Sequence, residues 1–409
     1  MKTLLILGAG TAGTLTANRL RKRLREWKIA VVDEDPTRYY QPGFLFLPFG
    51  IFSQTDVVKP RRHSIANGVD YLCAEVDRVQ AEKNRVLLRS GEHLNYDVLI
   101  IATGVKIAPE QTEGMLGCGW RVCVFDFYTF EGASALHRAL RNWNTGRLVV
   151  HITQMPIKCS VAPLEFAFLA DSWLKDRRLR DKTEIVYVTP LSAVFSKPVA
   201  AKVFGRVIEE KRIKVVTDFP LGRVDNNRHK IISCDGKEID YDLLVTVPTN
   251  AGDVAMGRSG LANELNFVAT DNHTLQSKQH SNIFVLGDAT DLPWPKSSSV
   301  AQFQSELLTE NVLHHIKGEP LESQFDGHAD RFINSGDGKA FPPGFDERLE
   351  SVDKKYRFPV LGPFSPQAHF DHFRELAFRW IYGTCSTEVL RCRELCLGLS
   401  ELRETAFPS

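Results

Sequence analysis

The sequence predicts an α/β protein built from two tandem Rossmann-like units, the second nested within the first and followed by an amphipathic helical region. Three observations support this fold class. Residues 4–7 form a short apolar run that ends in a glycine-rich turn and leads into a helical pattern. A second alternation of apolar strands and helices starts at residue 146, and an apolar segment at residues 282–289 returns the chain to the first unit. Such alternation is typical of parallel sheets covered by helices.

The N-terminal unit carries a complete dinucleotide-binding fingerprint. Gly8, Gly10 and Gly13 form the G-x-G-x-x-G motif directly after the first strand, and a second buried strand at residues 29–32 ends at Asp33, twenty residues past Gly13. The glycines allow a tight turn, close approach to a pyrophosphate and close packing of helix on strand. Asp33 would accept hydrogen bonds from ribose hydroxyls and repel a 2′-phosphate. We therefore expect the ADP-ribose part of FAD or NAD here, but not NADP.

Composition excludes several classes of function. The chain has 409 residues with 51 basic and 50 acidic side chains, so no charge excess favours nucleic acid as a partner. Its eight cysteines include no C-x-x-C pair, which argues against a disulfide framework or a metal site. The N-terminus lacks the features of a signal peptide, and no apolar run approaches the roughly 18 residues that span a bilayer. We expect synthesis in the cytoplasm.

Irregular and strand-like segments follow the fingerprint. Residues 39–50 (YYQPGFLFLPFG) are aromatic and interrupted by proline and glycine, which indicates a loop packed on the core, an apolar cover over a bound cofactor, or both. The basic cluster at residues 59–63 is expected to be a solvated turn, with contact to cofactor phosphates as the alternative. Residues 71–95 favour short strands joined by a turn, and a buried strand then ends at Thr103 and Gly104.

The nested unit repeats the alternation but lacks a second glycine-rich turn. Its strands are expected at residues 146–152, 182–188 and 241–247, with a helix at residues 163–174. The loop at residues 153–158 contains a proline and no glycine, so we expect no second dinucleotide to bind there. Electrons would have to enter by another route.

Cys159 directly follows this loop and offers such a route. A turn and a helix N-terminus after a strand favour the thiolate form of a cysteine, and Lys158 adds a neighbouring positive charge. The alternative is a small buried hydrophobic residue, which is the commonest fate of a cysteine. The position of Cys159 after the end of a strand favours a reactive thiol.

Taken together, these motifs resemble those of the sulfide:quinone oxidoreductases. The resemblance covers nearly the whole chain: the fingerprint, residues 39–44 (YYQPGF), the A-T-G that ends at Gly104, residues 156–165 (PIKCSVAPLE), and the G-D-A at residues 287–289 followed by Lys296. The cysteine block is the most specific of these motifs. The resemblance implies a tandem Rossmann fold, FAD as cofactor, sulfide or polysulfide as substrate, and a membrane quinone as electron acceptor.

The resemblance also implies roles for individual residues. Cys159 would carry sulfur at the flavin, Glu165 would accept protons, and Lys296 would place a positive charge near the pyrimidine end of the flavin. The alternative interpretation of Glu165 is an acidic residue in the first turn of a helix, stabilised by the helix dipole. The alternative for Lys296 is a solvated lysine in a loop. Asp288 would bind the ribityl chain of FAD. The cofactor contacts that the motifs imply are Gly8, Gly10, Gly13, Asp33, Thr103, Gly104, Gly287, Asp288 and Lys296.

The chain departs from the family pattern in its cysteines. The second redox cysteine of these enzymes usually lies in the region that corresponds to residues 325–364, where this chain has none. Cys123 resembles the family's other cysteine, which in some relatives tethers FAD covalently or receives polysulfide, and Cys118 is close to it in sequence. We therefore expect Cys159 and Cys123 to be the best redox pair. Without a pair, Cys159 would need an external sulfur acceptor.

Residues 326–409 are expected to form a quinone-binding and membrane-surface region. Apolar side chains recur at helical spacing within residues 370–381 and 389–399, a pattern shared by core helices, dimer surfaces and membrane-bound amphipathic helices. The resemblance favours peripheral, monotopic binding to a membrane and leaves a homo-oligomer open. The candidates for a quinone slot are Phe341, Phe358 and Phe364, whereas the tail cysteines Cys385, Cys392 and Cys396 are not assumed to be catalytic.

Residues 1–110 and 270–325 are thus expected to form the FAD-binding domain, and residues 111–269 the second domain. Two other functions stay open. A type II NADH:quinone dehydrogenase shares this fold but needs the glycine loop that the nested unit lacks. A non-catalytic sulfur-carrier flavoprotein is favoured only if the missing C-terminal cysteine abolishes turnover. A periplasmic flavocytochrome subunit would require a signal peptide.

Overall fold

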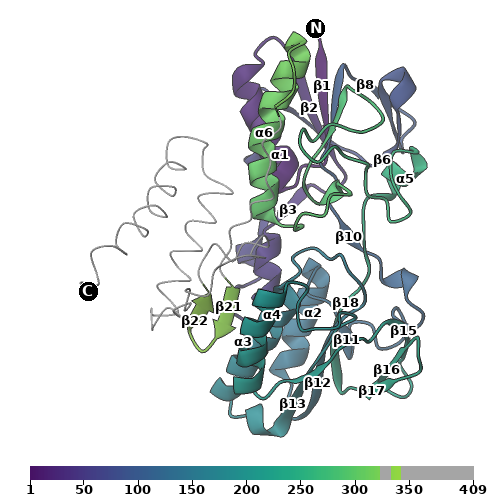
Figure 1. Cartoon of the computed structure of the whole chain (residues 1–409). Helices are drawn as coiled ribbons and strands as arrows, with labels where there is room; N and C mark the ends of the chain where they lie inside the picture. The colour runs from purple at the N-terminus through teal and green to yellow at the C-terminus, as the bar shows by residue number, and fades with distance from the viewer. Residues whose placement is uncertain (323–332, 342–409) are drawn as a thin grey trace, which may run out of the picture. The chain divides into compact units, whose positions relative to one another are not determined.

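Two parallel β-sheets organise the part of the chain that the computed structural model describes, residues 1–322 and 333–341 (Figure 1). The strands of the first sheet are β1 Thr3–Leu7, β2 Lys28–Asp33, β5 Asp70–Cys73, β9 Val98–Ile101 and β20 Ile283–Val285. The strands of the second sheet are β11 Val124–Phe125, β12 Gly146–Ile152, β13 Thr183–Val188, β14 Lys214–Val216 and β18 Leu243–Val247. Their orders are β20-β9-β1-β2-β5 and β11-β18-β12-β13-β14, with every pair parallel. The predicted α/β fold class with two Rossmann-like units is confirmed.

Helices and antiparallel strands pack on these sheets. Helices α1 (Thr11–Arg23) and α6 (Ser298–Lys317) lie side by side on the first sheet (Figure 1). The other helices are α2 Phe130–Arg141, α3 Ala162–Asp176, α4 Pro198–Glu210 and α5 Val254–Arg258. An antiparallel meander packs on each sheet: β6 Val76–Gln80, β7 Arg85–Leu88 and β8 His93–Asn95 on the first, and β15 Leu221–Asp225, β16 Lys230–Ser233 and β17 Glu238–Asp240 on the second.

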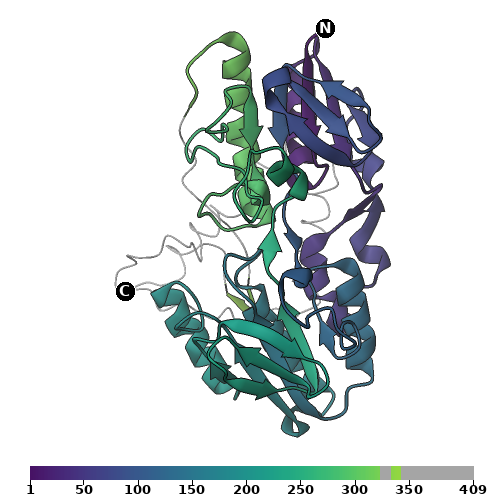
Figure 2. The same ribbon diagram turned by 90° about the vertical axis from the view of Figure 1, so that its right-hand side faces the viewer.

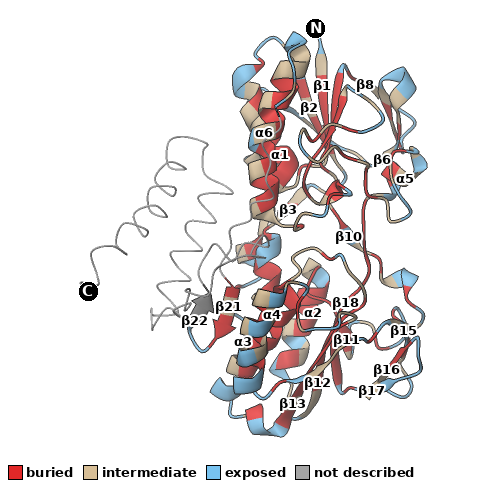
Figure 3. Ribbon diagram, in the orientation of Figure 1, coloured by how far each residue is buried: buried red, intermediate tan, exposed pale blue. Residues whose placement is uncertain are grey.

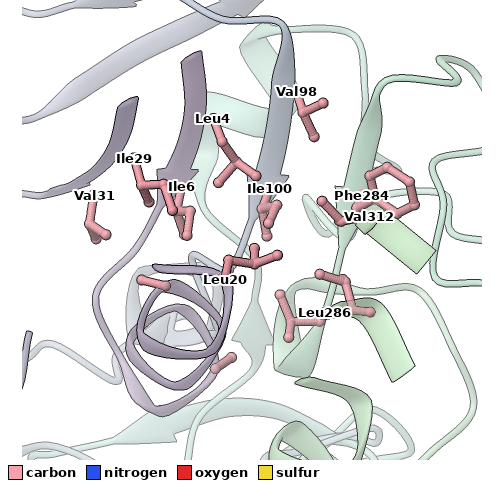
Figure 4. Packing of buried hydrophobic residues seen from close by; sticks show 14 of the residues in the cluster. Leu4, Ile6, Leu20, Ile29, Val31, Val98, Ile100, Phe284, Leu286 and Val312 are labelled. Carbon is pink, nitrogen blue, oxygen red and sulfur yellow. The ribbon is translucent and has the colours of Figure 1, made fainter. Parts of the chain in front are cut away.

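Strand β1 is buried on both faces, as its uninterrupted apolar run predicts. Leu4 and Ile6 pack against Leu20 of α1, as Figure 4 shows. Leu5 and Leu7 point to the opposite face and pack under the meander that includes β7. Alternate side chains of a strand point to opposite faces, so a strand covered on both sides must be apolar at every position. The same burial runs through the central strands of both sheets (Figure 3).

Between strands β9 and β20, the chain enters and leaves the second Rossmann-like unit on two segments that pair with each other. Strand β10 (Lys106–Ile107) leads into the second unit and β19 (Asn250–Ala251) leads back. They form an antiparallel two-stranded sheet (Figure 2). The second unit is thus inserted into the first through two connections that lie next to each other.

The aromatic segment at residues 39–50 packs on the core, as one of its two interpretations predicted. After β3 (Thr37–Tyr39) it forms two short 3₁₀ helices, Gln41–Leu45 and Leu47–Phe49. The ring of Phe49 lies 4.9 Å from that of Phe166 in α3, and the ring of Phe44 lies 6.3 Å from that of Phe130 in α2. This segment of the first unit thus packs on helices of the second. The cofactor-cover interpretation stays a prediction.

Several boundaries differ from the predicted ones. Strand β12 matches its prediction, and α3 extends the predicted helix by one residue at its start and two at its end. The predicted strand at residues 282–289 is shorter, because Gly287 adopts φ +70° and begins a 3₁₀ turn through Ala289. A glycine in this left-handed region ends the extended backbone.

The predicted C-terminal features lie mostly outside the described residues. These are the amphipathic segments within residues 370–399 and Phe358, Phe364, Cys385, Cys392 and Cys396. Phe341 is the last residue of strand β22 (Lys339–Phe341). Among residues 1–322 and 333–341, no helix combines the length and the apolar composition needed to cross a bilayer.

A hairpin of β21 (Ile333–Gly336) and β22 packs on α3 through a buried charge network. The carboxylate of Asp171 on α3 is fully buried and accepts hydrogen bonds from Arg180 Nε at 2.6 Å and Lys211 Nζ at 3.0 Å. Lys211 Nζ also donates to Asp337 of the hairpin turn at 2.8 Å. Burial alone would raise the pKa of Asp171, but hydrogen bonds from Lys175, Arg180 and Lys211 outweigh burial and lower it.

We expect Asp171→Ala to reduce the free energy of unfolding by about 3–5 kcal/mol at pH 7, because Arg180 and Lys211 would be left buried without their carboxylate. Urea unfolding followed by circular dichroism measures this loss. The matched control is Asp181→Ala, whose ion pair with Arg212 is exposed (side chains 87% and 71%) and which should cost less than about 1 kcal/mol.

The difference in unfolding free energy between wild type and Asp171→Ala should depend on pH, and the shifted pKa of Asp171 gives the sign. Because the folded state lowers the pKa of Asp171, its stabilisation is complete above the unfolded pKa of about 4 and is lost as the pH falls below that value. The difference between wild type and Asp171→Ala should therefore shrink between pH 6 and acid pH. A difference that stayed constant down to the acid transition would contradict the electrostatic origin.

Candidate functional site

The glycine-rich turn between β1 and α1 is shaped by the close approach of backbone. Gly8 has φ +95°, and a Cβ there would lie 2.3 Å from Ala102 O. A Cβ on Gly13 would lie 1.9 Å from Gly8 O. A Cβ on Gly10 would meet no protein atom within 4 Å. Protein packing thus requires the first and third glycines, whereas the space beside Gly10 is free for a ligand, as expected where a backbone must approach a pyrophosphate.

Asp33 at the end of β2 is bound to this turn. Its Oδ2 accepts a hydrogen bond from Ala9 N at 2.6 Å, and its Oδ1 accepts one from Asp35 N at 3.0 Å. Arg61 Nη2 lies 3.3 Å from Oδ1. The carboxylate is therefore fixed beside the glycine turn, where the fingerprint places the ribose of a dinucleotide.

The prediction that the basic cluster at residues 59–63 is a solvated turn is wrong for Arg61. Its guanidinium is buried and donates to Ala9 O at 2.7 Å, Asp35 O at 2.5 Å and Thr37 O at 2.7 Å. The guanidinium has five N–H donors, so one arginine side chain can bind several carbonyls at once. Arg61 thus joins the glycine turn to β3. Its position within a run of basic residues did not indicate this role.

Thr103, after strand β9, carries an unsatisfied hydroxyl. Its Oγ1 is buried and has no hydrogen-bond partner among the described residues. Gly104 follows with φ +71°. Buried hydroxyls without a partner are costly and rare in folded proteins. Because Thr103 follows the strand next to β1, this orphaned group fits a site that binds a dinucleotide such as FAD.

The turn at Gly287 lies beside the start of α1, because a Cβ on Gly287 would lie 3.3 Å from the Cβ of Ala12. Gly287 N donates to Gln304 Oε1 of α6 at 2.6 Å, a contact that no sequence motif indicated. Lys296 is buried, contrary to a solvated loop lysine, and its Nζ donates to Asp288 O at 3.0 Å and Thr290 O at 2.8 Å. Burial raises the pKa of the Asp288 carboxyl, and the charges of Lys158 and Lys296 oppose that rise. Lys296 therefore holds the turn and also offsets the charge of Asp288.

Cys159 lies where the two units meet. Its N–H donates to Lys296 O at 2.8 Å, and its carbonyl accepts from Ala162 N at 2.9 Å and Tyr128 Oη at 3.3 Å. Cys159 has φ +55°, a left-handed conformation that disfavours a residue with a Cβ. Such conformations cluster at functional sites, where surrounding contacts maintain them. The half-buried thiol is thereby fixed at the carboxyl edge of the second sheet.

Lys158 places a positive charge beside this thiol. Its Nζ donates to Gln41 Oε1 at 2.9 Å and lies 5.9 Å from the centre of the Tyr128 ring. Burial lowers the pKa of Lys158, and nearby Asp288, Cys159 and Asp126 favour its charged form. One ammonium thus interacts with the thiol and with the carboxylate of the Gly287 turn. Gln41 belongs to the YYQPGF motif, but its role as a partner of Lys158 required the tertiary structure.

The structure does not bring Cys123 and Cys159 together. Cys123 directly precedes β11, at the amino end of the second sheet, and the strand register places it level with the start of β18. Cys159 lies seven residues beyond Ile152, at the carboxyl end of β12. β18 alone spans about 13 Å at the usual rise per residue. The expected Cys159–Cys123 pair is therefore not formed in this structure, because parallel strands separate the two ends of the sheet.

Glu165 lies on α3 and binds the hairpin. It is buried, and its Oε1 accepts hydrogen bonds from Asn334 N and Asn334 Nδ2, both at 2.8 Å. This contact connects the helix that follows Cys159 to strand β21. The proton-accepting role of Glu165 stays a prediction.

Comparisons with known proteins agree with the motifs. The family model described as pyridine nucleotide-disulphide oxidoreductase matches residues 2–305. The mitochondrial sulfide:quinone oxidoreductase of Dictyostelium discoideum is 24% identical over 381 residues, covering 88% of this chain and 82% of that protein. The structure of the sulfide:quinone oxidoreductase of Aquifex aeolicus has a TM-score of 0.74 at 20% identity and covers 83% of each chain. The predicted resemblance to sulfide:quinone oxidoreductases is confirmed.

The same fold occurs in a different setting. A chain in the structure of the Tetrahymena thermophila mitochondrial ATP synthase has a TM-score of 0.78 at 20% identity, covering 94% of this chain and 96% of that one. At this identity the likeness shows the fold alone. The chemistry must therefore be argued from the site residues.

We expect Thr103→Val to weaken FAD binding about tenfold without destabilising the cofactor-free protein. The substitution removes a hydroxyl that has no partner among residues 1–322 and 333–341, and one lost hydrogen bond to a ligand costs about 1.4 kcal/mol. Fluorescence titration with FAD and thermal unfolding of the apoprotein measure the two quantities.

Thr16→Val is the matched control. Thr16 Oγ1 is buried and bonds to Ala12 O at 2.9 Å and Ser305 Oγ at 3.1 Å, so its loss should lower stability by about 1 kcal/mol and leave FAD affinity unchanged. Equal FAD affinity in Thr103→Val and wild type would remove Thr103 from the cofactor site.

Proposed function

The chain belongs to the pyridine nucleotide-disulphide oxidoreductase family, and we propose that it oxidises sulfide or sulfane sulfur at Cys159 and passes two electrons through FAD to a membrane quinone. The observation that carries this proposal is the position of Cys159. Its N–H bonds to Lys296 O, and its neighbour Lys158 interacts with Asp288, so the backbone of Cys159 is held close to the turn that the flavoprotein motif assigns to FAD. The names of the curated relatives support sulfide and quinone as the two substrates.

The residues around the glycine turn fit FAD. Gly10 leaves space for the pyrophosphate, Asp33 would bind the ribose hydroxyls, and Thr103 offers a hydroxyl that has no partner in the described part of the chain. Asp288 would meet the ribityl chain. When bound, FAD would supply a two-electron acceptor, and these residues would hold its pyrophosphate, ribose and ribityl parts.

Cys159 would carry the sulfur. Joining hydrosulfide to the Cys159 thiolate forms a sulfur–sulfur bond and releases one proton and two electrons. Lys158 stabilises the negative charge on the thiolate and on the resulting persulfide. Since no other cysteine of residues 1–322 lies at this edge of the sheet, the sulfur would leave to an external nucleophile such as a second sulfide.

The contacts of the loop at residues 153–158 weigh against NADH as the electron donor. Thr153 N donates to Val247 O, and Lys158 N donates to Asn250 Oδ1. Pro156 has no N–H. A pyrophosphate binds to free backbone amides at a glycine-rich turn, and the amides at both ends of this loop are already used. This favours sulfide oxidation over a type II NADH dehydrogenase.

We further propose that the protein acts at a membrane surface, where a quinone is available. Residues 326–409 would provide the quinone slot and the membrane contact. Phe341, Phe358 and Phe364 remain the candidate slot residues. A liposome flotation assay with and without these residues tests this part separately from sulfide oxidation.

Anaerobic addition of sulfide to the FAD-bound protein should bleach the flavin absorbance, and a soluble quinone should restore it. We expect Cys159→Ser to slow bleaching by at least about 100-fold, because it removes the group that carries sulfur. Cys73→Ser, which changes an exposed cysteine of the first unit, is the matched control and should behave as wild type. Bleaching by NADH but not by sulfide would overturn the proposal, and bleaching by neither would favour a sulfur carrier.

Lys158→Gln should slow both sulfide bleaching and alkylation of Cys159 at neutral pH by about tenfold, whereas Lys158→Arg should retain most of both rates. The glutamine removes the positive charge near the thiol but keeps much of the side chain's size. Stopped-flow absorbance measures bleaching, and peptide mapping after timed alkylation measures the thiol. Unchanged alkylation in Lys158→Gln would show that the charge does not activate Cys159.

A further inference from the structure

A tight turn before β11 holds two cysteines at the amino end of the second sheet. Gly119 O accepts hydrogen bonds from the backbone N–H groups of Val122, Cys123 and Val124, all at 2.9 Å. Asn226 fastens this turn, because its Oδ1 accepts from Gly119 N at 3.0 Å and its Nδ2 donates to Gly114 O at 2.7 Å. Cys118 and Cys123 thus belong to one short, well-bonded turn.

The side chain of Cys123 folds back over the start of this turn. A Cβ built on Gly119 would lie 3.1 Å from Cys123 Sγ, and Cys118 is the residue next to Gly119. Burial raises the pKa of the Cys123 thiol, and the neighbouring Cys118 raises it further. The two thiols are therefore close enough to interact electrostatically.

A buried tyrosine, Tyr241, belongs to the apolar cluster against which Cys123 packs. Tyr241 is buried, and its hydroxyl has no hydrogen-bond partner among the described residues. Burial raises the pKa of Tyr241, and Cys123, Asp225 and Cys118 each add to the rise. A neutral phenol beside two thiols can donate a hydrogen bond to a thiolate when one forms.

The exposure of the two thiols differs in a way that suits thiol–disulfide exchange. Cys118 is exposed and Cys123 is half-buried. Leu116 and Val122, which lie close to the pair in sequence, are 52% and 71% exposed. An accessible thiol can attack an incoming disulfide, and a shielded neighbour can then resolve the adduct.

We propose that Cys118 and Cys123 form a second, flavin-independent thiol site that is oxidised to a disulfide by low-molecular-weight disulfides such as glutathione disulfide. The Cys118 thiolate attacks the sulfur–sulfur bond of the small disulfide, forms a mixed disulfide and releases one thiolate. The Cys123 thiolate then attacks the Cys118 sulfur, forms the internal disulfide and releases the second. Each protein thiol gives up one proton, and two electrons pass from the protein pair to the small disulfide, which leaves as two thiols.

Trypsin cleavage makes this pair directly observable, because Arg121 lies between the cysteines. Complete cleavage gives the peptides 107–121, with Cys118, and 122–138, with Cys123. After incubation of the full-length holoprotein with glutathione disulfide and alkylation of free thiols, we expect a disulfide that links these two peptides. Dithiothreitol should convert it back to two alkylated peptides. A stable glutathione adduct on Cys118 of the wild type, or no reaction at either cysteine, would overturn the proposal.

Single variants assign the order of events. Cys123→Ser should stop at a glutathione adduct on Cys118, and Cys118→Ser should react at Cys123 at least about tenfold more slowly than wild type reacts at Cys118. Cys234→Ser, which changes another exposed cysteine of the second unit, is the matched control and should form the linked peptides as wild type does. Equal reaction of Cys123 in Cys118→Ser would show that the pair does not act in this order.

The same experiment on Cys159→Ser separates this site from the proposed function. Cys159 lies at the opposite end of the sheet, so the linked peptides should form at the wild-type rate while sulfide bleaching is lost. Loss of the linked peptides in Cys159→Ser would contradict an independent site. Failure of sulfide to bleach the flavin would leave the peptide result unchanged.

Discussion

The contact on which the site depends is the backbone pairing between Lys158 and Lys296. These residues form a parallel bridge, and within it Cys159 N donates to Lys296 O at 2.8 Å. The bridge joins the loop after β12 of the nested unit to the loop after β20 of the first unit. Because Lys296 also binds the turn at Asp288 through Nζ, one residue fixes both the thiol and the acidic group expected at the flavin. The position of Cys159 is thus determined by contacts between the two Rossmann-like units.

Buried cations that bind backbone carbonyls recur throughout the described chain. Arg61 binds three carbonyls around the glycine turn, and Lys296 binds two around the Asp288 turn. Arg180 combines the Asp171 carboxylate with the carbonyls of Thr183 and Lys211. Burying a charge is costly unless its hydrogen bonds are complete, so each of these side chains specifies one loop geometry. These contacts fix the backbone of the loops around the parallel strands.

The separation of Cys123 from Cys159 changes how the sulfur chemistry must be understood. A redox pair needs two sulfurs within bonding reach, with Cα atoms about 4.4–6.8 Å apart. Parallel strands carry all their carboxyl ends to one edge and all their amino ends to the other, and Cys123 lies directly before β11 whereas Cys159 lies after β12. The described chain therefore has one thiol at the proposed flavin face and two at the opposite edge, which argues for an external sulfur acceptor at Cys159 and a separate chemistry at Cys118 and Cys123.

The sequence by itself determined the fold class, the glycine turn with Asp33, and the position of Cys159 after a strand. These features depend on local backbone geometry and on the burial of consecutive apolar residues, which neighbouring positions in the chain record. Only the tertiary structure decided that Arg61 is buried against the glycine turn, that Gln304 and Gln41 hold Gly287 and Lys158, and that Cys123 faces Cys118 instead of Cys159. These contacts join residues far apart in the sequence or at opposite ends of a sheet, so they depend on strand order and direction, which no local pattern encodes.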